Sequence, residues 1–141
     1  MDKTLKRFID AQERDYDTAY SEIENGKKVG HWMWYIFPQI KGLGSSFMSI
    51  HYAIESLDEA KAYWNNDYLR NNLLTITEAL LKNDDSAIEI FGYTDSMKLK
   101  SCMTLFEVAT KEAIFSKVLD KFFDGKEDES TTKIVADCLE F

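Results

Sequence analysis

Residues that break helices are scarce along this chain. One proline, Pro38, and six glycines occur among 141 residues, which is a low number for a fold that needs many tight turns. Between these breakers, apolar residues recur at steps of three and four, the spacing of one face of a helix. No stretch of strand length alternates apolar and polar residues. The pattern therefore predicts an all-α fold.

The expected helices follow from apolar periods and from the residues that flank them. The first is amphipathic from Leu5 to Ile23 and ends at Asn25 and Gly26, a left-handed stop. Segment 32–37 can be a short buried strand or a helical turn, and the neighbouring helices favour the turn. Further helical segments are expected over 87–91, 94–110 and 115–123, with others beginning at 45 or 46, 56, 67 and 130 or 131. A chain of this length forms one core. We therefore expect a single domain, 1–141, built as a compact bundle of six to eight helices.

Three helix boundaries can be predicted from particular residues. Ser56 and Glu59 match a capping box, in which the serine accepts from a backbone N–H and the glutamate accepts in return. Asp67 is expected to cap the following helix. Gly92 is expected to stop the short helix at 87–91 before the next one begins.

Charge and hydropathy exclude several classes of protein. The net charge is −8 and the pI about 4.8, with basic residues scattered among acidic ones. Duplex nucleic acid and anionic membranes are therefore not expected partners, because both need clustered basic residues. No apolar run approaches the roughly 20 residues that cross a bilayer. Cys102 and Cys138 show no metal-ligand spacing, and the N-terminus shows no export signal. We expect reduced thiols, no metal and a cytoplasmic protein; the oligomeric state is not predicted.

An unusual aromatic segment, residues 31–44, is the first candidate site. It begins with His31, whose ring can serve as a general acid or base or, alternatively, satisfy a buried carbonyl. Aromatic residues of this segment can stack on a flat ligand or pack in the core, and Gln39 can hydrogen-bond to such a ligand. The candidate stacking residues are Trp32, Trp34 and Phe37. Trp32 and Trp34 would lie about 200° apart on a helix, so that one can be buried while the other lines a surface.

A second candidate cluster lies on the helix expected at 96–106. Lys98, Ser101 and Thr104 recur at steps of three and share one stripe of that helix. A lysine and two hydroxyls near a helix N-terminus suit a phosphate or carboxylate. The same residues can also be a solvated lysine and two hydroxyls packed between helices.

Common catalytic and cofactor motifs are missing from the sequence. It contains no GxSxG, GxGxxG, P-loop or HExxH pattern. Pairs of carboxylates are frequent, but they fall on expected exposed faces or in the acidic loop at 124–129, which we interpret as solvated surface. No cofactor is predicted.

The aromatic segment carries a family resemblance. The run from His31 to Gln39, followed by Gly42-Leu43-Gly44-Ser45-Ser46, resembles a bacterial family known as domain of unknown function 1810. The stretches 52–60, 98–106 and 122–128 agree with it, so the resemblance spans nearly the whole chain. Cys102 stands where a second serine is commoner in that family. The resemblance implies a small multihelical domain and no particular activity, although some relatives carry the label calpastatin.

These observations support three hypotheses about function. The first is binding of a small polar ligand with a flat ring, such as a nucleotide or an ADP-ribose derivative, in a cleft between segment 31–44 and the 96–106 helix. The second is a glycohydrolase acting on such a ligand with His31 as acid or base; a faint likeness to helical glycohydrolases associated with NAD and ADP-ribose points the same way. The third is a protein-interaction module that uses exposed aromatic residues.

Overall fold

The computed structural model describes residues 4–139, and the predicted all-α fold is confirmed within them. These residues form eight helices and one isolated parallel β-bridge, between Ile40 and Ile54. The helices are α1 (Lys6–Glu24), α2 (Met33–Ile36), α3 (Phe47–His51), α4 (Leu57–Asn65), α5 (Asp67–Leu81), α6 (Ala87–Thr110), α7 (Ala113–Phe123) and α8 (Glu129–Leu139). In the described part of the chain, no helix combines the length and the apolar character that crossing a membrane requires.

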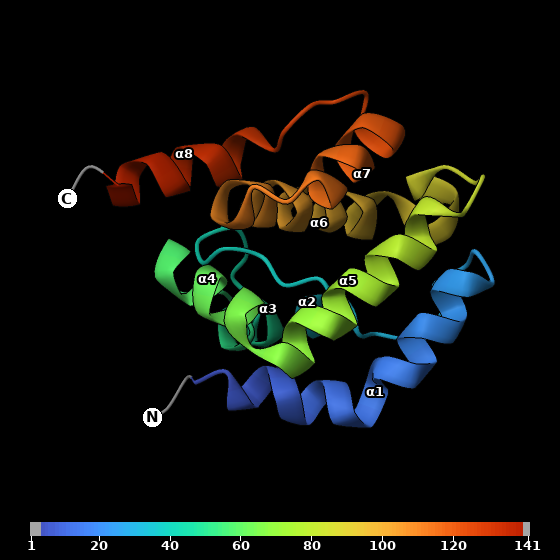
Figure 1. Ribbon diagram of the computed structural model, residues 1–141, viewed down its shortest axis with the longest axis horizontal. Helices are drawn as coiled ribbons and strands as arrows, with labels where there is room; N and C mark the ends of the chain where they lie inside the picture. The colour runs from blue at the N-terminus through green and yellow to red at the C-terminus, as the bar shows by residue number, and fades with distance from the viewer. Residues whose placement is uncertain (1–3, 140–141) are drawn as a thin grey trace.

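The helices surround one apolar core. α6 packs against α4, α7 and α8, while α5 packs against α1, α4 and α7. Figure 1 shows α6, α7 and α8 gathered on one side of the molecule and α1 on the opposite side, with α2 to α5 between them. The rings of Tyr63, Phe106 and Phe115 follow one another at centroid distances of 5.2 and 5.8 Å. Because these rings come from α4, α6 and α7, they join the α6 and α7 side to the middle of the bundle.

Several predicted helix boundaries agree with the structure, but α7 and α8 begin at Ala113 and Glu129, one or two residues before their predicted starts, and two predicted side-chain contacts at helix starts also differ. Gly92 interrupts α6 with a φ of 78°, as expected for a stop between two helical pieces. Ser46 caps α3 and Ser56 caps α4. The cap of α5, however, is Asn66 rather than Asp67, because the Asn66 side chain accepts the Leu69 N–H.

The second difference concerns capping boxes. The reciprocal half predicted for Ser56 and Glu59 is wrong: the Glu59 carboxylate accepts from the backbone N–H of Glu55 instead. A complete capping box begins α6, where Ser86 and Glu89 each accept the other's backbone N–H. This box follows the same sequence rule and was missed.

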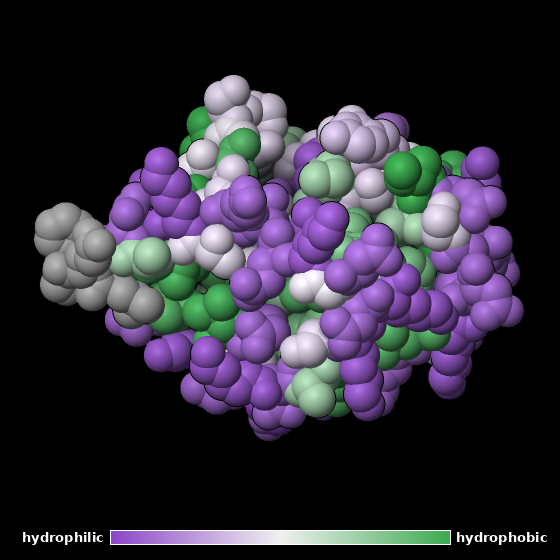
Figure 2. Space-filling model, turned by 90° about the horizontal axis from the view of Figure 1, so that it is seen from above, coloured by the Kyte–Doolittle hydropathy of each residue, from purple (hydrophilic) through white to green (hydrophobic). Residues whose placement is uncertain are grey.

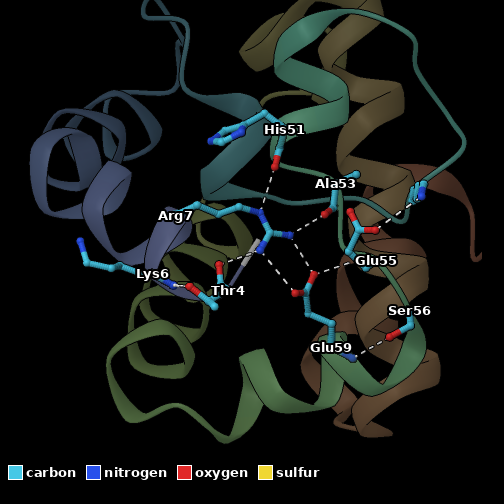
Figure 3. Close-up of polar contacts among 9 residues, drawn as sticks. Thr4, Lys6, Arg7, His51, Ala53, Glu55, Ser56 and Glu59 are labelled. Atoms are coloured by element: carbon cyan, nitrogen blue, oxygen red, sulfur yellow. Dashed lines mark hydrogen bonds and ion pairs between the residues drawn. The ribbon is translucent and has the colours of Figure 1, made fainter. Parts of the chain in front are cut away.

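The buried guanidinium of Arg7 binds the Glu59 carboxylate. Figure 3 shows this guanidinium at the centre of a polar network. Arg7 Nη2 and Nη1 donate to the two carboxylate oxygens at 2.8 and 3.3 Å. The guanidinium also donates to the main-chain carbonyls of Thr4, His51 and Ala53 at 2.7, 2.9 and 2.7 Å. The Arg7 side chain is only 5% exposed, so these bonds replace the water that burial removes.

The same network fixes the chain between α3 and α4. Residues 51–55 are bound through carbonyl groups to Arg7 and through the Glu55 N–H to Glu59. The β-bridge adds two backbone bonds of 2.8 Å, from Lys41 to Ile54 and from Ile54 to Gln39. Segment 39–41 is therefore held against segment 51–55, although neither is part of a long helix.

A second carboxylate fixes the start of the aromatic segment on α1. Glu22 Oε1 accepts three N–H groups: Val29 N at 2.7 Å, Gly30 N at 2.9 Å and the Trp32 indole at 2.8 Å. Burial alone would raise the pKa of the Glu22 carboxyl, but these hydrogen bonds outweigh burial and lower the pKa below its ordinary value. Glu22 therefore determines where the chain between α1 and α2 lies.

The surface on the α7 and α8 side is mainly hydrophilic. Figure 2 shows this face covered by polar residues, with apolar residues visible in separate patches between them. This distribution agrees with the net charge of −8 and with helices whose charged faces point to solvent.

Candidate functional site

A cleft of about 240 Å³ lies where the middle of α6 meets the chain between α2 and α4 and the start of α8. The wall from the 34–53 segment includes Trp34, Gln39 and Tyr52. α6 contributes Lys98 and Ser101 to the facing wall. The cleft therefore lies between the two clusters that the sequence singled out.

The structure brings together four of the predicted site residues. Trp34, Gln39, Lys98 and Ser101 all line this cleft. The Lys98 ammonium lies 4.9 Å from the centroid of the Trp34 ring, a cation–π distance. Trp34 is half-buried whereas Trp32 is 2% exposed. The expectation that one tryptophan is buried and the other lines a surface is confirmed.

Trp32 and Phe37 lie in the core and not in the cleft. Phe37 is fully buried, and both rings lie against Phe91 of α6, at centroid distances of 6.4 Å for Trp32 and 6.0 Å for Phe37. The Trp32 indole N–H is already used by Glu22. These two aromatic residues fix the segment onto α6, which is what places Trp34 at the cleft.

Thr104 is buried beneath the cleft and joins two elements of its wall. Its hydroxyl donates to the Lys100 carbonyl at 2.8 Å and accepts the Asp128 N–H at 2.9 Å. The threonine therefore attaches the start of α8 to α6. Ser101 does line the cleft, and its hydroxyl donates to the Met97 carbonyl at 3.1 Å.

His31 is not part of the cleft. Its side chain is exposed at the start of the aromatic segment, and it is not among the residues of the lining. The structure thus separates His31 from Lys98 and Gln39.

The Asp95 carboxylate is a counter-ion shared by two lysines beside the cleft. Its carboxylate lies 2.8 Å from the ammonium of Lys28 and 3.2 Å from that of Lys98. Burial alone would raise the pKa of the Asp95 carboxyl, but the two lysines outweigh it and hold the pKa below its usual range. One carboxylate therefore faces two ammonium groups.

Trp34 and Gln39 each contribute to the cleft wall a polar group that lacks a partner within residues 4–139. The indole N–H of Trp34 is buried and makes no hydrogen bond to the described residues. The side-chain amide of Gln39 also makes none there. A buried N–H without a partner costs roughly 1–3 kcal/mol, and such a group in a native protein points to an ordered water or a ligand.

Asp128 is a cleft residue that sequence reasoning missed. We interpreted the loop at 124–129 as solvated surface, but Asp128 lines the cleft. Its Oδ2 accepts the Thr131 backbone N–H at 3.0 Å and the Thr131 hydroxyl at 2.5 Å. The available signal was the spacing from Asp128 to Thr131, which is that of a helix N-cap.

The described residues show no group of three or more His, Cys, Asp or Glu side chains placed to hold a metal ion. Cys102 is a free, fully buried thiol, whereas the structure describes only the backbone at Cys138. Burial raises the pKa of the Cys102 thiol, which removes the reactive thiolate.

Cys102 is therefore expected to resist thiol reagents in the folded protein. In a Cys138→Ser variant, which leaves one thiol, labelling should occur only as fast as the protein unfolds and should become rapid in urea. The measurement is the time course of modification by a chromogenic disulfide. Rapid stoichiometric labelling in native buffer would show that the site opens locally.

Comparison with known proteins places the chain in a family. The model of the family described as "Protein of unknown function (DUF1810)" matches residues 2–135. The chain belongs to this family. It is also similar to the crystal structure of the conserved hypothetical protein Rv1873 from Mycobacterium tuberculosis, with 43% sequence identity and a TM-score of 0.92. The match covers 94% of this chain and 96% of that one. No curated protein matches the chain.

Proposed function

We propose that this protein binds a small polar ligand with a flat ring in the cleft between the 34–53 segment and α6. One observation carries the proposal: Trp34, Gln39, Lys98 and Ser101, chosen from two separate parts of the sequence, line one cleft. Ligand sites typically combine apolar and aromatic walls with a few polar groups that orient the ligand.

Each group of the wall has a role in the proposed complex. The Trp34 ring stacks on the ligand ring, because aromatic faces bind any flat π-system. Lys98 meets an anionic group, and the unpartnered amide of Gln39 hydrogen-bonds to the ring edge. No observation on the cleft favours catalysis, because His31 is exposed and outside the lining.

A thermal-shift screen tests whether such a ligand exists. We expect adenosine, adenosine monophosphate or ADP-ribose to raise the melting temperature by about 5–10 °C at 100 times Kd. A panel of these compounds together with NAD and free bases covers the proposed class. A flat response across the whole panel would contradict the proposal.

The stacking role of Trp34 has its own test. Trp34→Leu should weaken binding of the best compound by roughly 5- to 150-fold, since stacking on one aromatic residue is worth about 1–3 kcal/mol. Isothermal titration calorimetry measures the effect. Tyr68→Leu is the matched control, because Tyr68 is an exposed aromatic residue on α5 away from the cleft. Equal losses in the two variants would argue against a contact with Trp34.

A further inference from the structure

The cleft wall carries opposite charges on two different elements. Lys98 belongs to α6, and Asp128 precedes the first turn of α8. Asp128 uses Oδ2 for Thr131, while its Oδ1 accepts no hydrogen bond from residues 4–139. One carboxylate oxygen at this edge of the cleft is therefore available as an acceptor.

The positive charge of Lys98 is only partly compensated. Asp95 is shared with Lys28, whose side chain is 8% exposed and whose ammonium also donates to the Gly30 carbonyl at 2.6 Å. Lys98 is 24% exposed and has Asp95 as its ion-pair partner in the described structure. Because one carboxylate neutralises one ammonium, a surplus positive charge remains on the Lys98 side of the cleft.

The volume of the cleft limits the size of its occupant. Sites that enclose drug-sized ligands measure roughly 300–1,000 Å³, whereas this cleft measures about 240 Å³. A ligand with one ring system and one charged group is of suitable size. The second half of a dinucleotide would lie outside.

We propose that the ligand is an anion with one flat ring system and separated polar ends, of the size and chemistry of a nucleoside monophosphate. Its anionic group binds at Lys98, and hydroxyl or amino groups at its other end donate to Asp128 Oδ1. Trp34 binds the ring between them. This inference rests on the proposed ligand-binding function and adds the charge, the polarity and the size of the ligand.

The anionic end is tested with adenosine monophosphate and adenosine as probes. We expect the monophosphate to bind the protein about 10-fold or more tightly than the nucleoside, because a charge-assisted hydrogen bond adds this much. Lys98→Met should abolish that preference, so that the two probes bind the variant with Kd values within about 2-fold of each other. Lys117→Met, the same charge change at an exposed position of α7, should preserve the preference. Preference retained in Lys98→Met would overturn the assignment of Lys98.

The contact between the donor groups of the ligand and Asp128 is tested by Asp128→Asn. Asparagine caps helices as well as aspartate does, so α8 should persist, and circular dichroism melting checks this. In this variant the asparagine oxygen accepts from Thr131, so its NH₂ group takes the place of Asp128 Oδ1. A hydrogen-bond donor then stands where the ligand needs an acceptor. Adenosine monophosphate should then bind about 10-fold more weakly. Glu127→Gln, the same charge change one residue earlier and outside the cleft, should leave Kd unchanged. An unchanged Kd in Asp128→Asn would overturn the role of Asp128.

The outcomes separate this inference from the proposed function. If no flat-ring compound binds, both are wrong. If adenosine binds as tightly as its monophosphate, or ADP-ribose binds far more tightly than either, the cleft binds ligands but a nucleoside monophosphate is the wrong class.

Discussion

Replacing Arg7 by methionine is expected to lower the free energy of unfolding by about 3–5 kcal/mol. The guanidinium is buried and makes five hydrogen bonds, to three carbonyl groups and to both oxygens of Glu59. Methionine fills similar space but leaves the Glu59 carboxylate and these carbonyls without their donor. Domains of this kind are stable by roughly 5–15 kcal/mol, so the loss is a large fraction of the total. Urea denaturation followed by circular dichroism measures it.

Two further variants test whether the loss in Arg7→Met comes from the hydrogen bonds of Arg7 or from the removal of a positive charge. Lys6→Met removes the neighbouring charge on α1, but Lys6 is exposed and pairs with the exposed Asp10, so this variant should cost far less than Arg7→Met. Arg7→Lys should recover little, since an ammonium cannot match the planar set of donors. A loss of less than about 1 kcal/mol in Arg7→Met would contradict the structural role.

Removing the Glu22 side chain should have the second largest effect. Glu22→Ala is expected to lower the free energy of unfolding by about 3 kcal/mol, because three N–H groups, including the indole of buried Trp32, lose a charged acceptor. Glu22→Gln keeps an acceptor oxygen and should cost about 1–2 kcal/mol. Glu13→Ala, at an exposed position of the same helix, should stay within about 0.5 kcal/mol.

The charge of Glu22 also predicts a pH dependence. The pKa of this carboxyl is lowered in the folded state from an ordinary value of 4.5. Its contribution is therefore complete above pH 4.5 and is lost as the pH falls through the lower pKa of the folded state. The difference in unfolding free energy between the natural protein and Glu22→Gln should shrink below pH 4.5. A difference that stays constant down to pH 3 would show that the charge itself contributes nothing.

The helices could be predicted because their signals are local. The apolar period of α1 and the stop at Asn25 and Gly26 involve residues within a few turns of one another. The interruption at Gly92 follows from one residue in a left-handed conformation. Such features need no knowledge of the rest of the chain.

The errors arose where a local pattern had a distant partner or a near-equal neighbour. Glu59 had the spacing of a capping box, but Arg7, 52 residues away, binds its carboxylate. Asn66 and Asp67 are both good caps, and the structure uses Asn66. Asp128 has the local sequence of a solvated loop residue, but its N–H donates to Thr104 and this contact places it in the cleft wall.

Local sequence thus determined the helical class, most helix boundaries and the two segments that could carry a site. Only the tertiary structure decided which aromatic side chains are core and which reach a ligand. Trp32 and Trp34 have the same local sequence signals. Trp32 is buried because Glu22 accepts its N–H and Phe91 packs on its ring, whereas Trp34 lines the cleft with the Lys98 ammonium over its ring. These contacts join residues far apart in sequence, and their geometry exists only once α1, α2 and α6 have packed together.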